Sequence, residues 1–159
     1  MIVISDTSPI SYLFKINQLE LLKLLFGSVI IPVAVYDELL QVEEQASWLN
    51  NKPDWMIVKS ASNHALVETF RKVLDKGESE AIALATELHA DALLIDEAKG
   101  RFVAKQEGIQ VTGVMGILLE AKHQNLITSI KPLLEILIQN HFRISDTVYT
   151  AILKSANEL

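Results

Sequence analysis

Four carboxylates are the side chains of this 159-residue sequence with the clearest potential for chemistry. They are Asp6, Glu38, Glu78 and Asp96. Carboxylates that are held together repel one another and bind protons more tightly unless a cation lies between them. A hard divalent ion such as Mg²⁺ or Mn²⁺ removes that repulsion, activates water and stabilises the charge that develops on a phosphate. If the fold brings these residues together, they predict metal-dependent cleavage of a phosphodiester.

Two of the acids, Asp6 and Asp96, directly follow apolar runs at residues 2–5 and 92–95 that are typical of buried strands. Open parallel sheets bind ligands at the carboxyl ends of their strands, so we expect both acids at one edge of a sheet. Glu38 follows a predicted strand that ends near residue 31, in the second turn of the next helix. A third carboxylate can therefore join the first two.

Glu78 precedes its strand, and its placement depends on the direction of the helix that it opens. A helix leading into a parallel strand runs opposite to it, so the N-terminus of this helix should lie beside Asp96. Glu78 also continues the apolar stripe within residues 81–85 that should face the sheet. Glu80 lies toward the flank and is the second choice. Glu97 should point away from the site or reach an ion through water.

Each acid also has a structural explanation. Asp6 precedes residues 7–9, Thr-Ser-Pro, and can cap a helix. Glu78 in a first turn interacts favourably with the helix dipole, and Glu38 can belong to a solvated acidic face. Asp96, after four apolar residues, is the hardest to explain structurally. No single acid favours the functional interpretation by itself. The convergence of all four positions on one edge of the sheet does.

Composition limits the partners and the metal. The chain has no cysteine, so an ion must be held by oxygen or imidazole, and the four histidines show no metal-binding spacing. The net charge of −6 disfavours nucleic acid, although two divalent ions would bring it to about −2 by adding four. Lys99, Arg101 and Lys105 share one predicted helix and can steer a phosphate backbone, although a solvated helix face explains them equally well. No apolar run reaches the roughly 18 residues of a membrane span and no leader pattern precedes Asp6, so we expect a cytoplasmic protein without membrane contact.

The order of apolar runs predicts a three-layer α/β/α sandwich with a central parallel sheet. Strands are predicted at residues 2–5, 29–31, 92–95 and 109–111, with residues 55–58 as either a strand or a connector. A helix is predicted to begin at residues 6–9, and further helices at residues 19–25, 33–48, 65–74, 77–88, 97–107 and 113–124. Beyond residue 125 only helices are predicted, at 130–138 and 145–157. We therefore expect one domain over residues 1–125 and a C-terminal helical extension over 126–159, packed on that domain or on a partner.

The sequence resembles the PIN-domain family, specifically its VapC-like branch of short prokaryotic proteins of the DUF3368 type. The motifs that carry the resemblance lie within about residues 1–125. They are Asp6-Thr7-Ser8-Pro9, the run from Ile31 to Leu39, the run from Gly77 to Ala85, and Leu94-Ile95-Asp96-Glu97.

The resemblance implies a metal-dependent endoribonuclease in which Asp6, Glu38, Glu78 and Asp96 form the catalytic and metal-binding cluster. It also implies a homodimer and, for the toxins of type II toxin-antitoxin pairs, a small antitoxin protein that blocks the site. The chain departs from the family pattern in two places. Ser8 stands where many members carry asparagine, and can touch the water shell of a metal. The third acid is a glutamate in a Gly-Glu-x-Glu context, which leaves Glu78 and Glu80 both open.

Our hypothesis is that the acids support attack of water on an RNA phosphodiester while Arg101 or Lys99 holds the RNA backbone. One alternative is a catalytically silent PIN-like module that binds a protein partner. Another is a phosphoryl-transfer domain of the receiver or haloacid-dehalogenase type. The haloacid-dehalogenase pattern requires a second acid two residues after Asp6, where this chain has Ser8. The receiver pattern requires neighbouring acids after the first strand, which are not evident.

Overall fold

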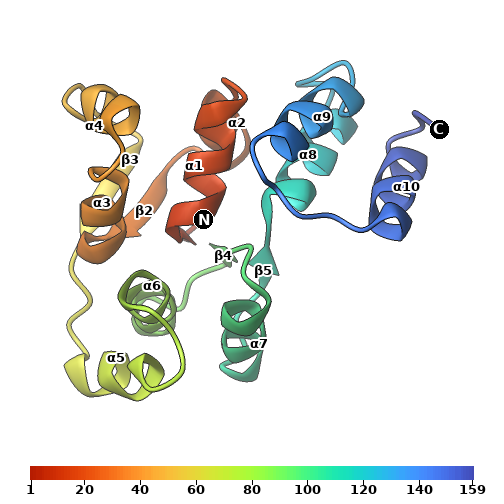
Figure 1. Ribbon diagram of the computed structural model, residues 1–159. Coiled ribbons are helices and arrows are strands. Elements are labelled where there is room, and N and C mark those ends of the chain that lie inside the picture. Colours follow the sequence, from red (N-terminus) through yellow and green to blue (C-terminus); the bar gives the residue numbers. More distant parts are fainter.

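A five-stranded parallel sheet forms the centre of the computed structural model, which describes residues 1–159 (Figure 1). Its strands are β1 (Val3–Ser5), β2 (Val29–Pro32), β3 (Met56–Lys59), β4 (Ala92–Leu94) and β5 (Val111–Thr112). Their order in the sheet is β3-β2-β1-β4-β5, and every neighbouring pair is parallel. All five strands therefore end on the same side of the sheet, which we call its edge. The carboxyl end of β1 lies in the middle of this edge, between those of β2 and β4.

Residues in the strands alternate between two hydrophobic cores, one on each face of the sheet. Val3 and Leu94 belong to one core, while Ile4, Leu93 and Ile95 belong to the other. Successive side chains of a strand point to opposite faces, and a parallel sheet is covered on both, so its strands are apolar throughout. This explains why continuous apolar runs, without polar alternation, marked the central strands in the sequence.

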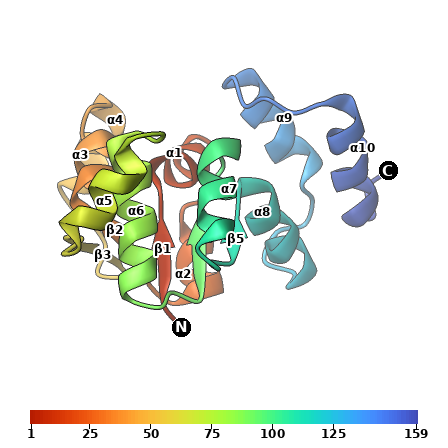
Figure 2. The same cartoon turned by 90° about the horizontal axis from the view of Figure 1, so that it is seen from below.

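Ten helices surround the sheet. They are α1 (Thr7–Lys15), α2 (Glu20–Phe26), α3 (Val33–Leu39), α4 (Glu43–Leu49), α5 (His64–Arg71), α6 (Lys76–Glu87), α7 (Ala98–Gln106), α8 (Val114–His123), α9 (Lys131–Gln139) and α10 (Asp146–Ser155). Helices α1, α2 and α8 pack on one face, and α5, α6 and α7 on the other (Figure 2). The predicted three-layer α/β/α class is confirmed.

The predicted single helix over residues 33–48 is wrong. The structure has two helices there, α3 and α4, separated by residues 40–42. Val42 adopts an extended backbone conformation at the N-cap of α4, and the first turn of α4 carries Glu43 and Glu44, which favour a helix N-terminus. The break lets Gln45, which is buried, donate a hydrogen bond of 3.0 Å from its Nε2 to Ser11 Oγ.

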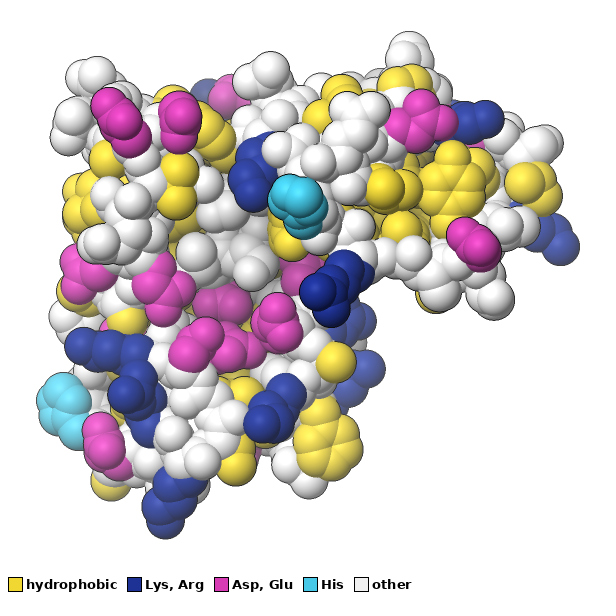
Figure 3. All heavy atoms as spheres, viewed as in Figure 1, with side chains coloured by type: hydrophobic (Ala, Val, Ile, Leu, Met, Phe, Trp, Pro, Cys, Tyr) yellow, Lys and Arg dark blue, Asp and Glu magenta, His cyan; other side chains and the backbone are white.

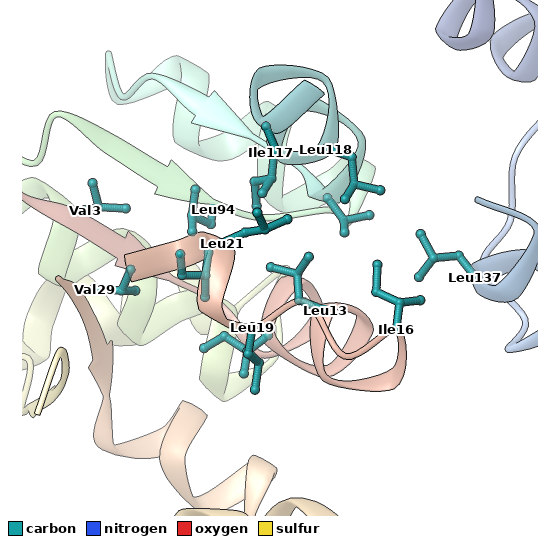
Figure 4. Close-up of a cluster of buried hydrophobic side chains, with 14 of the residues drawn as sticks. Val3, Leu13, Ile16, Leu19, Leu21, Val29, Leu94, Ile117, Leu118 and Leu137 are labelled. Atoms are coloured by element: carbon teal, nitrogen blue, oxygen red, sulfur yellow. The ribbon is translucent and has the colours of Figure 1, made fainter. Parts of the chain in front are cut away.

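The C-terminal helices pack into the core on the α1 side of the sheet. Leu134 and Leu137 of α9 are fully buried in that core, and Figure 4 shows Leu137 close to Ile16 of the α1 C-cap and Leu118 of α8. Near the C-terminus, Glu158 accepts hydrogen bonds from the backbone N–H groups of Ile130 and Lys131, at the start of α9, and forms a 3.0 Å ion pair with Lys122 of α8. Through these contacts the C-terminal end of the chain packs against α8 and the start of α9.

None of the ten helices combines the length with the apolar composition that crossing a bilayer requires.

Candidate functional site

Asp6 lies where β1 ends, and its side chain does not act as a helix cap. The backbone of Asp6 occupies the N-cap of α1, but its carboxylate makes no capping hydrogen bond there. Only 3% of the residue is exposed. Burial raises the pKa of Asp6 to about 7; the backbone N–H of Thr7 lowers it, and the nearby carboxylates of Asp75, Glu38 and Asp96 raise it further. The structural explanation for this residue therefore fails, and a buried carboxyl group remains at the centre of the sheet edge.

Asp96 follows β4 and is held by one of its two oxygens. Its Oδ1 accepts a 2.9 Å hydrogen bond from the N–H of Val114, in the first turn of α8. Its Oδ2 is buried and has no hydrogen-bond partner. Burial raises the pKa of Asp96, whereas the Val114 N–H and the positive charge of Arg101 lower it. An oriented carboxylate with one unsatisfied buried oxygen is a suitable ligand for a cation, because buried polar atoms are rarely left without a partner.

Glu78 lies in the first turn of α6 and is 7% exposed. Burial raises its pKa to about 8; the side chain of Asp75 and the charge of Asp6 act in the same direction, and the backbone N–H of Asp75 lowers it. Glu78 therefore lies close enough to Asp6 for the charge of Asp6 to raise its pKa, as the direction of α6 predicts.

Glu38 reaches the same edge of the sheet from α3. Its Oε2 accepts a hydrogen bond from the hydroxyl of Thr7, the residue that follows Asp6. The negative charge of Glu38 is among the charges that raise the pKa of Asp6. The structure thus brings together all four carboxylates that the sequence singled out.

Three glycines leave the space that these carboxylates occupy. A Cβ atom at Gly77 would lie 2.5 Å from Glu38 Oε1, and one at Gly100 would lie 2.6 Å from Glu78 Oε2. At Gly113 the same atom would lie 2.5 Å from Asp96 Oδ1. Each distance is shorter than atoms in van der Waals contact allow, so any larger residue would displace a carboxylate.

Acidic side chains gather at the centre of the molecular face shown in Figure 3, with lysine and arginine side chains around them.

Asp75 is a fifth acid at this site, and it was not among the candidates that the sequence predicted. It caps α6 by accepting a 2.8 Å hydrogen bond from the Glu78 N–H, and its charge raises the pKa of both Asp6 and Glu78. An aspartate three residues before a glutamate at a helix start is the signal that could have identified it.

The remaining candidates divide into structural and peripheral ones. Glu80 accepts a 3.2 Å hydrogen bond from the Ala34 N–H at the start of α3, so its side chain is engaged there. Glu97 is exposed at the N-cap of α7. Ser8 lines a cleft of about 480 Å³ together with Asp96.

The two basic candidates also differ. Lys99 is exposed, whereas Arg101 is half-buried and donates a long hydrogen bond of 3.4 Å to the carbonyl of Ile95. Arg101 is therefore the cation that is fixed beside Asp96.

The donor set suits a hard divalent cation, although no three of the Asp, Glu and His side chains are arranged as a preformed metal site. All the candidate ligands are carboxylate oxygens, as Mg²⁺ and Mn²⁺ prefer. Two of the carboxyls, Asp6 and Glu78, have pKa values raised to about 7 and 8, and Asp96 has an unpartnered oxygen. A cation would satisfy each of these features.

A family model, DUF3368, described as a PIN domain, matches residues 2–158. The match extends over the C-terminal helices as well as over the four motifs near the acids. No curated protein and no solved structure matches the chain significantly.

Proposed function

Because the chain belongs to the PIN-domain family, whose members are generally nucleases, we propose that it is an endoribonuclease dependent on Mg²⁺ or Mn²⁺. The observation that carries the proposal is the convergence of Asp6, Glu78 and Asp96 at one edge of the sheet, where burial raises the pKa of each. Buried carboxyl groups that repel one another destabilise a fold, and binding of a divalent ion would explain why they are present.

Each acid has a distinct part in the proposed site. Asp6, Glu78 and Asp96 would hold the ion, and Asp96 would offer the Oδ2 that has no partner within the protein. Glu38 would contribute from the edge, with its direction fixed by the Thr7 hydroxyl. When bound, a divalent ion lowers the pKa of water and stabilises negative charge on a phosphate.

The basic side chains would hold the RNA. Arg101 lies beside Asp96, so its guanidinium can bind the oxygens of a phosphate that approaches the acids. Lys99, exposed on the same helix, would attract the RNA backbone at longer range.

The resemblance to the VapC-like branch supports a more specific biological role. We propose that the protein is the toxin of a type II toxin-antitoxin pair, that it forms a homodimer, and that a small antitoxin protein blocks its site. In this proposal residues 1–125 carry the nuclease function, and residues 126–159 form the helical extension.

The test is cleavage of single-stranded RNA with Mn²⁺ or Mg²⁺ by the native protein, Asp6→Asn and Asp96→Asn. We expect cleavage by the native protein, loss of at least about a hundredfold in each variant, and none in a chelator. The exposed carboxylate of Asp54 supplies the matched control, since Asp54→Asn should cleave as the native protein does. Equal activity of all four proteins would refute the assignment.

The rival function is that of a catalytically silent module that binds a protein partner. It would retain the fold and yet bind no divalent ion at this edge. Titration with Mn²⁺, followed by its paramagnetic broadening of NMR signals near Asp6 and Asp96, separates the two. Broadening confined to these acids supports the nuclease, and uniform or absent broadening supports the silent module.

A further inference from the structure

A second cleft adjoins the acids on the side of α7. It has a volume of about 660 Å³, within the range of about 300–1,000 Å³ that is common for ligand pockets. Asp96 lines this cleft as well as the smaller one at Ser8. A molecule that occupies the larger cleft would therefore touch the candidate active site.

The cleft lies between the main body and the C-terminal arm, residues 140–159. Phe102 and Lys105 come from α7, whereas Phe142 and Val148 come from the arm. Figure 3 shows the surface hollowed beneath this arm, beside the central acidic patch.

Phe102 is the only exposed aromatic side chain of the protein. It is 63% exposed, so most of its ring is open to solvent. Phe142, by contrast, is held by an edge-to-face contact with Tyr12, with ring centroids 5.0 Å apart. The cleft thus presents one free ring on a rigid helix and one ring that is fixed by packing.

Two cations accompany the free ring. Arg101 and Lys105 lie four residues apart on α7, and Lys105 lies three residues from Phe102, so all three share one side of the helix. Like charges at this spacing repel, and neither side chain forms an ion pair with a carboxylate. An anionic ligand would relieve that repulsion.

We propose that this cleft binds one nucleotide of single-stranded RNA next to the phosphate that is cleaved, with its base stacked on Phe102 and its backbone held by Arg101 and Lys105. The inference rests on the proposed ribonuclease function, which it extends by naming a subsite. Aromatic platforms beside basic side chains are how proteins bind single strands, because every base offers a π face and every nucleotide a phosphate. Since stacking tolerates all four bases, the subsite favours unpaired RNA without fixing its sequence.

A segment of a protein partner is the alternative occupant, since the cleft also has an apolar lining. The two cations beside the ring favour RNA. The two occupants make different demands on position 102: a peptide needs an apolar surface, whereas a base needs an aromatic ring.

The test compares Phe102→Leu, which keeps an apolar side chain, with Phe102→Trp, which keeps a ring. Because the residue is exposed on α7, neither change should unfold the protein. All binding is measured in an Asp6→Asn background with Mg²⁺, by the fluorescence anisotropy of a short fluorescein-labelled single-stranded RNA. Val73→Leu, another exposed apolar position, is the matched control.

We expect Phe102→Leu to weaken RNA binding about tenfold, equivalent to about 1.4 kcal/mol, and Phe102→Trp to bind at least as tightly as the parent. Lys105→Gln should reduce the slope of log affinity against log salt by about 0.7, and Lys131→Gln on α9 should not change it. Double-stranded RNA of the same sequence should bind equally well to Phe102→Leu and to its parent, because paired bases are not free to stack on the ring.

Equal binding of single-stranded RNA by Phe102→Leu and its parent would overturn the subsite and leave a peptide as the occupant. This failure is distinct from failure of the nuclease proposal. If the native protein does not cleave RNA but the ring at position 102 still controls binding, the subsite stands and the nuclease assignment fails. If the native protein cleaves RNA and position 102 has no effect, the nuclease assignment stands and the subsite fails.

Discussion

The replacement Asp6→Asn should make the metal-free protein more stable at neutral and alkaline pH. Burial raises the pKa of Asp6 from 3.8 to about 7, a shift of about three units. Each unit corresponds to about 1.36 kcal/mol, so ionised Asp6 destabilises the folded state by up to about 4 kcal/mol. Asparagine cannot ionise, so this cost is absent from the variant.

The pH dependence follows from the sign of this shift. Below about pH 4 the carboxyl of Asp6 is protonated in both the folded and the unfolded chain, so it adds no pH-dependent term. Between about pH 4 and 7 the unfolded chain loses the proton while the folded chain keeps it, and the native protein loses stability as pH rises. Above about pH 7 both states are ionised and the loss is complete. The gain from Asp6→Asn should therefore grow from pH 4 to pH 7 and then level off.

Urea unfolding in a chelator, repeated from pH 4 to pH 8.5, measures this difference directly. Structural relaxation and water will reduce the upper limit, and we expect a gain of at least about 1 kcal/mol at pH 8. Asp54→Asn, on an exposed turn, should change stability by less than about 0.5 kcal/mol at every pH. A gain from Asp6→Asn that is independent of pH, or a loss at pH 8, would refute the reasoning.

Adding Mn²⁺ should reduce the stability advantage of Asp6→Asn over the native protein. An ion that binds only the folded state stabilises it by about 2.7 kcal/mol at a hundred times its dissociation constant. The native protein should gain this, and Asp6→Asn should gain much less.

Three further predictions concern the supports of the site and the C-terminal helices. Gly113→Ala should reduce RNA cleavage at least about tenfold while leaving the unfolding midpoint almost unchanged, because its Cβ would displace Asp96 Oδ1; full cleavage would show that the carboxylate has room to move. Leu137→Ala should lower the free energy of unfolding by about 2–5 kcal/mol, because the side chain is fully buried; a loss under about 1 kcal/mol in urea would mean that α9 packs only loosely. Glu158→Gln should weaken the hold on α9 and on Lys122, which hydrogen exchange in α9 would detect as lost protection; unchanged exchange would assign these contacts no stabilising role.

The sequence was sufficient to predict the acids that follow strands, because two physical rules fix them. Apolar runs that end in Asp6 and Asp96 are buried strands, and parallel strands end at the same edge. Glu78 required a further step, the direction of a helix that leads into a strand. Tertiary contacts decided the cases that were missed: Asp75 reads in the sequence as an ordinary cap, and its charge matters only because α6 begins beside Asp6.

Helix boundaries were less predictable for a related reason. Residues 33–48 have a continuous helical pattern, yet the helix is interrupted between α3 and α4. Gln45 of α4 donates a hydrogen bond to Ser11 of α1. The last strand, predicted at residues 109–111, lies at Val111–Thr112, because the backbone of β4 selects its register. Local patterns predicted most of the elements, and long-range contacts determined where they begin and end.

The arrangement of glycines argues that the acidic edge is built for its carboxylates. Gly77, Gly100 and Gly113 each stand where a single added carbon would collide with an acidic side chain. Two of them lie in the first turns of helices α6 and α7, where glycine favours the helical conformation less than alanine does. These glycines and the buried carboxylates therefore both lower the stability of the fold at this site. Such costs gathered at one place, in a protein whose two cores are otherwise apolar, are what a bound cation would offset.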